Sequence, residues 1–262
     1  MRAFVPLLLV TAAFANDTAM HDGGSGPEPV GWTKDAESVI RMEREEVEVE
    51  MGPFDSSVTC RFVFVSGKKD APAIQFLGFP DITRSFSESD NMGPLRDMRT
   101  FVNGREVKSE MVSKRMGDDG KWIDLPEPQD PCETWHVVKV SFPPGEEVVV
   151  ERRFRTDNGR TAGGPVFFGY TTETGGNWRG TIGKGTFTVR LADGLQAAKL
   201  DLEPKTGWKK SEDGRLLTLE WKDFEPRTDE TRRYWSVGWF PADGDPMQYE
   251  KVQGKLEKAY SK

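Results

Sequence analysis

Apolar residues alternate with polar ones along much of the chain, and this period constrains the possible folds more than any other feature. In EEVEVEM, Val47, Val49 and Met51 share one face, with glutamates on the other. The same alternation recurs in VTCRFVFV at 58–65, TFTVRL at 186–191 and LLTLEW at 216–221. A period of two, with β-branched and aromatic residues and Gly/Pro punctuation, is typical of half-buried strands. We therefore expect an all-β fold.

The breaks in this pattern predict how the chain is divided. The Gly-rich, aperiodic stretch TDNGRTAGG begins at residue 156 and marks a boundary. We expect two sandwich-like antiparallel lobes, at 36–156 and 157–243. Residues 16–35 are rich in Gly, Pro and Asp and predict an extended lead-in. Apolar residues spaced three and four apart favour a short C-terminal helix over 244–262.

Two hairpins follow from local signals. Asn103-Gly104 tolerates positive φ at both central positions of a type I′ turn, so TFVNGREV predicts a tight hairpin. The strand TWHVVKVSF at 134–142 is followed by the turn PPGEE and by VVVERRFR at 148–155. Since Pro143 and Pro144 cannot donate ladder hydrogen bonds, we expect them in a turn across which these two strands meet.

The first fifteen residues have the profile of a secretory signal peptide. Arg2 is the positive n-region, 3–12 form a short apolar region, and Ala13-Phe14-Ala15 fits the small-x-small cleavage pattern. The apolar run is shorter than the roughly 20 residues a membrane-spanning helix needs. We expect an exported protein, periplasmic or extracellular, that begins near Asn16 and has no transmembrane segment after cleavage.

Composition narrows the classes of partner and cofactor. The chain has 36 basic and 43 acidic residues and a formal charge of −7, without a long basic segment, which disfavours nucleic acid. Cys60 and Cys132 could form a disulfide, which export would permit, or remain two buried thiols. With no CxxC pair and only two histidines, the sequence indicates no metal site, and it indicates no cofactor.

The loop YTTETGGNWRGTIGKGT at 170–186 carries Gly, Asn, Trp, Arg and Lys. Trp178 stands where a phosphate-binding Walker loop needs glycine, and a strand follows where that motif needs a helix. We therefore expect an architectural corner in which glycines supply unusual backbone angles. Trp178 would fold back to cap the second lobe or fill the junction between the lobes, with its indole N–H donating to a carbonyl.

Several of these stretches together resemble a family of secreted bacterial β-rich domains of unknown function. They are NDTA directly after the leader, IRMEREEVEVEMG, TWHVVKVSFPPGEEVVVERRFR and YTTETGGNWRGTIG followed by FTVRL. The sequence departs from the family at Arg153, where a more histidine-like position is expected, and in the loops at 81–130. The resemblance implies export and a β architecture, and it transfers no catalytic residue.

The sequence favours binding over catalysis. His136 shares a strand face with Val138 and Val140, which is typical of a structural histidine rather than a base. We expect no catalytic residues and a binding or assembly module of the envelope or extracellular space, with a protein or carbohydrate partner. The alternative is a carbohydrate-active hydrolase or lyase that uses paired carboxylates, which would place shifted pKa values in a cleft. The candidate binding residues are Trp122, Asn177, Trp178, Arg179 and Trp208.

Overall fold

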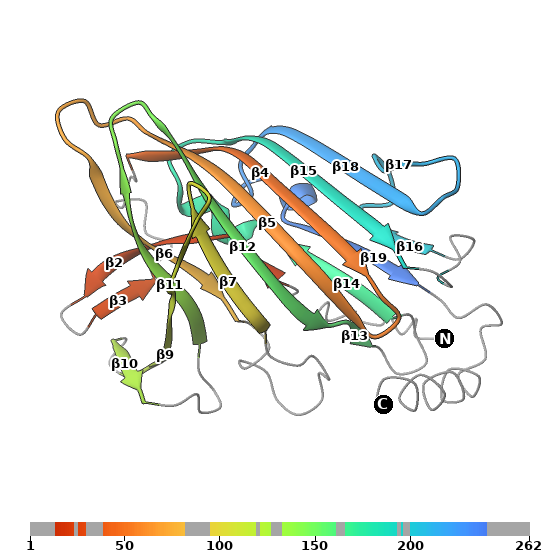
Figure 1. The fold of residues 1–262 in the computed structure, drawn as a ribbon, viewed down its shortest axis with the longest axis horizontal. Coiled ribbons are helices and arrows are strands. Elements are labelled where there is room, and N and C mark those ends of the chain that lie inside the picture. Colours follow the sequence, from red (N-terminus) through yellow and green to blue (C-terminus); the bar gives the residue numbers. More distant parts are fainter. Residues whose placement is uncertain are drawn as a thin grey trace, which may run out of the picture.

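The computed structural model describes residues 14–23, 26–29, 39–81, 95–118, 121–126, 133–160, 166–192, 195 and 200–239. Within these ranges the protein is almost entirely β-strand, which confirms the predicted all-β class (Figure 1). Two short 3-10 helices, η2 (Glu173–Asn177) and η4 (Glu230–Arg232), are the helical elements that they contain.

The strands form three sheets. The largest is eight-stranded, in the order β17 (Lys209–Lys210), β18 (Leu216–Phe224), β15 (Ile182–Leu191), β4 (Ile40–Met51), β5 (Asp55–Ser66), β12 (Glu147–Asp157), β7 (Arg96–Val102), β8 (Arg105–Val107). A six-stranded sheet runs β10 (Trp122–Leu125), β9 (Glu110–Met116), β11 (Glu133–Phe142), β6 (Ala73–Pro80), β2 (Thr18–Gly23), β3 (Gly26–Pro29). A five-stranded sheet runs β1 (Phe14–Ala15), β14 (Val166–Thr171), β19 (Tyr234–Trp239), β16 (Leu200–Glu203), with β13 (Gly159–Arg160) also on β14.

The eight-stranded sheet takes strands from both predicted lobes and so joins them. The link is the pairing of β15 with β4, which is parallel and brings Phe187 beside Val47. Against one half of this sheet packs the six-stranded sheet, through rings such as Phe79 of β6 and Phe154 of β12. Against the other half packs the five-stranded sheet, through Trp235 of β19 and Phe187. One large sheet is thus covered by two smaller sheets, with a continuous buried apolar cluster across both halves, and the division into two lobes stays a prediction.

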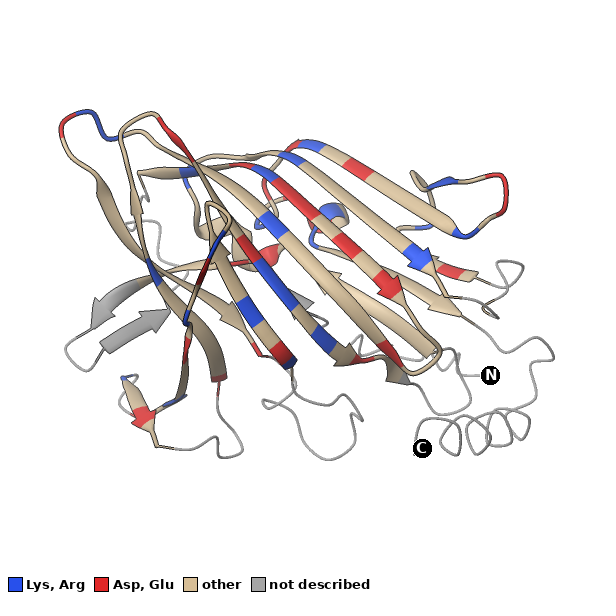
Figure 2. Cartoon of the chain, viewed as in Figure 1, with Lys and Arg blue, Asp and Glu red and all other residues tan. Residues whose placement is uncertain are grey.

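Both smaller sheets cover the same face of the large one. Phe187, Val47, Cys60 and Arg152 are consecutive cross-strand partners, and all four are buried. Directly opposed residues lie on the same side of a sheet, so this row marks the covered face. The residues that alternate with this row are exposed or half-buried on the other face, and Figure 2 shows acidic and basic residues interspersed along these strands. The ion pairs on that face include Arg44 with Glu147, Arg61 with Glu46, and Lys184 with Glu220.

One predicted hairpin is confirmed and the other is wrong. β7 and β8 pair across Asn103 and Gly104, which have φ of 49° and 77°, as a type I′ turn requires. β11 and β12, expected to meet across PPGEE, do not pair. β11 lies between β6 and β9, whereas β12 lies between β5 and β7. In both strands apolar residues alternate with polar ones, so each strand can cover one side of the core. The chain leaves the six-stranded sheet at Pro143 and Pro144 and then enters the eight-stranded sheet.

Several predictions fall on residues outside the described ranges. These are most of the leader, the helix expected over 244–262 and Cys132. Cys60 is buried in the core, but because its expected partner lies outside these ranges, the Cys60–Cys132 bridge stays a prediction. The segment predicted as an extended lead-in contributes β2 and β3 to the six-stranded sheet, and Asn16 to Met20 are buried.

Candidate functional site

The five predicted binding residues do not gather into one site. Trp122 lies on β10 at one end of the six-stranded sheet, where its ring meets Trp135 edge-on at 5.8 Å. Trp208 lies in the loop before β17, donates from Nε1 to the Pro204 carbonyl at 3.1 Å and packs on Trp235. Trp178 lies outside the strands of all three sheets, at the C-terminal end of η2. Three tryptophans from three separate places cannot form a single aromatic binding surface.

The corner at Trp178 is architectural, as predicted. The side chain is 2% exposed, its ring packs 4.7 Å from that of Phe64, and Nε1 donates to the Asp17 carbonyl at 2.8 Å. Next to it, Asn177 donates to Thr18 Oγ1 at 2.8 Å, while the side chain of Arg179 is exposed. The loop thus fastens η2 to the segment that links β1 and β2.

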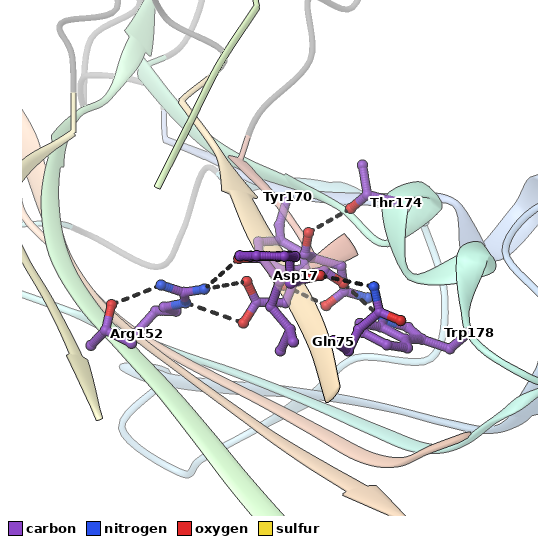
Figure 3. A network of polar contacts seen from close by, with 10 residues as sticks. Asp17, Gln75, Arg152, Tyr170, Thr174 and Trp178 are labelled. Carbon is purple, nitrogen blue, oxygen red and sulfur yellow. Dashed lines mark hydrogen bonds and ion pairs between the residues drawn. The ribbon is translucent and has the colours of Figure 1, made fainter. Parts of the chain in front are cut away.

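Beneath Trp178 lies a buried polar junction that the sequence analysis did not anticipate (Figure 3). Its centre is Asn16-Asp17-Thr18, which crosses from the five-stranded sheet to the six-stranded sheet between β1 and β2. Asn16 and Asp17 are fully buried. The side chains around them come from the eight- and five-stranded sheets and from η2, and the Leu77 carbonyl of the six-stranded sheet accepts from Arg152, so this short segment lies where the three layers meet.

An ion pair between Asp17 and Arg152 connects the segment between β1 and β2 to the large sheet. The guanidinium donates from Nε to Asp17 Oδ2 at 3.1 Å and from a terminal nitrogen to Oδ1 at 2.8 Å, a bidentate pair. The other terminal nitrogen donates to Thr100 Oγ1 at 2.7 Å. Both partners are fully buried. Such a pair is stable only because nearly every charged atom has a hydrogen-bond partner.

Asn16 connects the junction to the other half of the molecule. Its Nδ2 donates to Glu45 Oε2 at 3.1 Å, and the Tyr170 hydroxyl donates to its Oδ1 at 3.0 Å. Its backbone carbonyl accepts from Thr174 Oγ1 at 2.7 Å. Gly175 leaves room for this contact, because a Cβ there would lie 2.3 Å from Asn16 Nδ2. This close approach, rather than any ligand contact, explains one of the loop glycines.

The ionisable groups of the junction are strongly perturbed. Burial raises the pKa of Glu45 to about 8, although the nearby Tyr170 hydroxyl and Asn16 amide favour its carboxylate. Burial also raises the pKa of Asp17, opposed by the charge of Arg152. For Tyr170 and Cys60, burial and the neighbouring carboxyl groups raise the pKa well above the usual value. The common cause of these pKa shifts is the low dielectric of the core, which disfavours the charged form of each acid.

The geometry gives this cluster a structural role. Asp17 and Glu45 are two perturbed carboxyl groups, as the hydrolase alternative would require, but both are fully buried beneath Trp178. A glycosidic bond has no route to them in this conformation, and catalysis requires contact with the reacting atoms. The pKa shifts therefore reflect burial in a closed core, which disfavours the charged forms of these carboxyl groups.

The sequence did contain a signal for this junction, in the strand alternation itself. On β4, Glu45 falls on the same buried face as Val47 and Val49. On β12, Arg152 falls on the same buried face as Val150 and Phe154. Charged residues at core positions of two alternating strands predict a buried polar network, because an unpaired buried charge is very costly. Assigning all the glutamates of EEVEVEM to the solvent face was wrong for Glu45, which is fully buried.

His136 behaves as a structural residue. Its side chain is 13% exposed, and Nε2 lies 3.6 Å from Asp81 Oδ2. Asp81 also accepts a hydrogen bond from the Leu95 backbone N–H at 3.4 Å. Val138 and Val140, on the same face of β11, are buried. His136 thus lies at the end of the buried face of β11, next to the Asp81 carboxyl group.

A different surface has the character of a binding region. β9 and β10 form a hairpin at the end of the six-stranded sheet, and β10 is its terminal strand in the described part of the chain. Met111, Met116 and Ile123 on this hairpin are 51%, 53% and 41% exposed. They are three of the five large apolar side chains that are exposed among the described residues; the others are Val39 and Ile74. We call Met111, Met116, Trp122 and Ile123 the hairpin surface.

The comparisons with known proteins concern the fold. No family model and no curated protein matches the chain. A "putative nutrient binding protein" from Legionella pneumophila is similar in structure, with a TM-score of 0.56 and 14% identity over 86% of this chain and 71% of that one. An M1 zinc metallopeptidase from Deinococcus radiodurans gives a TM-score of 0.36 and 11% identity, over 76% of this chain and 42% of that one.

Of these two similarities, the first is high enough to indicate a shared architecture, and at 14% identity it extends to the fold alone. The chain spans less than half of the metallopeptidase. In the described ranges we find no helix that has both the length and the apolar character needed to cross a bilayer.

Proposed function

We propose that this protein is an exported, non-catalytic module that binds a protein partner of the cell envelope or extracellular space through the hairpin surface. The partner contributes an extended apolar segment, which adds to the edge of β10. The observation that carries this proposal is the concentration of exposed apolar side chains on the terminal hairpin of one sheet.

The physical basis is strand addition. A terminal strand presents backbone N–H and C=O groups along its outer edge, and an extended peptide can pair with them. Met116 and Trp122 are opposed in the hairpin, as are Arg115 and Ile123, so apolar groups lie on both faces of the edge. Exposed apolar surface of this kind marks interaction sites, and side-chain contacts on alternate faces would supply specificity.

Two further observations support a binding module. The strongly perturbed carboxyl groups of the junction are closed off from solvent, so they offer no reaction site. The structural neighbour from Legionella pneumophila is described as a nutrient binding protein, which is compatible with a binding role on this architecture.

A photo-crosslinking residue at position 123 tests the proposal in the native host. We expect one envelope protein to be captured, identified by mass spectrometry and then purified for a direct binding measurement. Ile123→Lys should weaken that binding at least about tenfold, since an apolar contact would be replaced by a charge that must be desolvated.

Ile74 supplies the matched control. It is an isoleucine that is 64% exposed on β6, an interior strand of the same sheet. Ile74→Lys should leave binding unchanged. Equal capture from positions 74 and 123, adducts only between copies of this chain, or full binding by Ile123→Lys would each contradict the proposal.

A further inference from the structure

The predicted cleavage point and the centre of the buried junction are the same place in the chain. The leader pattern ends at Ala15, and the next residue, Asn16, is fully buried. A new chain terminus is normally found at the surface, where water solvates its charge. Here the terminus would lie among Glu45 of the large sheet, Tyr170 of the five-stranded sheet and Thr174 of η2, so its charge would need a partner in the core.

Glu45 is such a partner. It is fully buried, its Oε1 makes no hydrogen bond, and no Lys or Arg among the described residues forms an ion pair with it. The Tyr170 hydroxyl lies close enough to Glu45 to favour its carboxylate, but its single proton is donated to Asn16 Oδ1. A buried carboxyl group without a cation is uncommon, because its charged form is costly in a low dielectric.

Residue 16 is already in direct contact with Glu45. Asn16 Nδ2 lies 3.1 Å from Glu45 Oε2, and the backbone nitrogen belongs to the same residue. Tyr170 and Thr174 hold the Asn16 side chain and carbonyl, so residue 16 keeps its anchors when residues 1–15 are removed. The β1 strand that would be lost consists of two residues at the edge of its sheet.

We propose that export processing creates a structural cation at this point: the α-ammonium group of Asn16 forms a buried ion pair with the carboxylate of Glu45. Water hydrolyses the Ala15–Asn16 peptide bond, with its hydroxyl going to the Ala15 carbonyl carbon and a proton to the Asn16 nitrogen. The amine then takes up one proton from solvent. The leader thus controls formation of this ion pair, because the cation does not exist until the leader is removed.

This inference rests on the predicted leader but not on the hairpin surface, and its labelling and stability tests do not require export. Two proteins are purified, one that begins at Asn16 and one that begins at Ala15, each released from an N-terminal fusion partner by a protease that leaves no extra residue. Reductive methylation of the native proteins then reports the accessibility of each amine. The Asn16 α-amine should react at least about tenfold more slowly than the exposed Lys69.

Charge pairing, as opposed to burial alone, is tested by Glu45→Gln in both proteins. The substitution should lower the unfolding temperature of the form that begins at Asn16 and leave unchanged or raise that of the form that begins at Ala15. Glu46→Gln is the matched control, because Glu46 is the next residue on β4 but pairs with Arg61 on the exposed face. It should have the same small effect in both forms.

The results separate the alternatives. An Asn16 α-amine that reacts like Lys69, or an equal effect of Glu45→Gln in both forms, would overturn the ion pair. The labelling measurement uses the unsubstituted protein, so it decides the matter even if Glu45→Gln does not fold. Mass spectrometry of the exported protein should give Asn16 as its first residue, and any other start would also overturn the proposal. None of these results bears on partner binding by the hairpin.

Discussion

Arg152 and Asp17 form a bidentate ion pair inside the core, 135 positions apart in the chain. Arg152 belongs to the large shared sheet, and Asp17 to the segment between the two smaller sheets. Their two hydrogen bonds therefore link all three layers at one point. A buried pair of this kind adds little stability compared with an apolar pair, but it strongly disfavours any arrangement in which one partner is missing.

Replacing Arg152 by Met should destabilise the protein by about 3–5 kcal/mol, since Asp17 would be left buried without its cation. Replacing Asp17 by Asn in the same variant should recover part of that loss, because the uncompensated charge is removed. Arg153→Met is the control: its side chain is exposed and pairs with Glu151 on the outer face, so its effect should be near experimental error. Urea unfolding measures all three, and similar values for Arg152→Met and Arg153→Met would exclude the structural role of the pair.

Trp178 closes the junction, so Trp178→Phe tests how far that closure depends on one hydrogen bond. The smaller ring can still pack on Phe64, but the Asp17 carbonyl loses its donor. A buried carbonyl left without a donor costs about 1–3 kcal/mol, and we expect a loss of stability in that range. Trp208→Phe is the comparison, since Trp208 is half-buried and its bond to Pro204 lies within one loop. A larger effect at position 208 than at 178 would contradict this account.

Much of the fold could be predicted from local pattern. The alternation of Val47, Val49 and Met51 gives their strand and its buried face, and Asn103-Gly104 gives a hairpin. The burial of Trp178 could also be predicted, since an indole in a Gly-rich corner needs both apolar contact and a carbonyl. These properties depend on neighbours within a few residues, which a single sequence displays.

The pairing of distant strands could not be predicted in the same way. The period of two shows which face of a strand is buried but not which strand lies beside it. The parallel pairing of Phe187 with Val47 and the change of sheet at Pro143 therefore had no local signal. The buried junction did have a local signal, namely the charged residues at core positions of β4 and β12. Asn16, which contacts one of these residues, lies in a segment without hydrophobic periodicity and could not be placed beside them.

Gly175 and Gly180 in the corner loop have different roles, which two substitutions can separate. A Cβ on Gly175 would lie 2.3 Å from Asn16 Nδ2 and 3.0 Å from Ile182 Cδ1, so Gly175→Ala must displace the junction. Overpacking of this kind typically costs about 1–3 kcal/mol. Gly180 has φ of +65° and open space around it, and Asn tolerates this conformation, so Gly180→Asn should have a much smaller effect. Equal losses in thermal unfolding would show that backbone conformation, not space, governs both positions.

Glu45 should make stability depend on pH in a chain that retains residues before Asn16. Its pKa is about 8 in the folded protein, against an ordinary value of 4.5. As pH rises above about 4.5, the unfolded state gains stability by ionising this group while the folded state keeps it protonated. The folded protein should therefore lose about 1.4 kcal/mol per pH unit up to about pH 8, on the order of 4–5 kcal/mol in total.

Glu45→Gln isolates this effect, because glutamine keeps the shape of the side chain but cannot ionise. Asp17, Arg152, Tyr170 and Cys60 face the same junction and remain in both proteins, so their contributions cancel in the difference. The stability of Glu45→Gln minus that of the parent should increase between pH 4.5 and 8, whereas Glu46→Gln should show no such trend. In the form that begins at Asn16, a paired carboxylate would stay ionised and the trend should flatten. A flat difference for both forms in urea unfolding across this pH range would show that Glu45 is not perturbed at all.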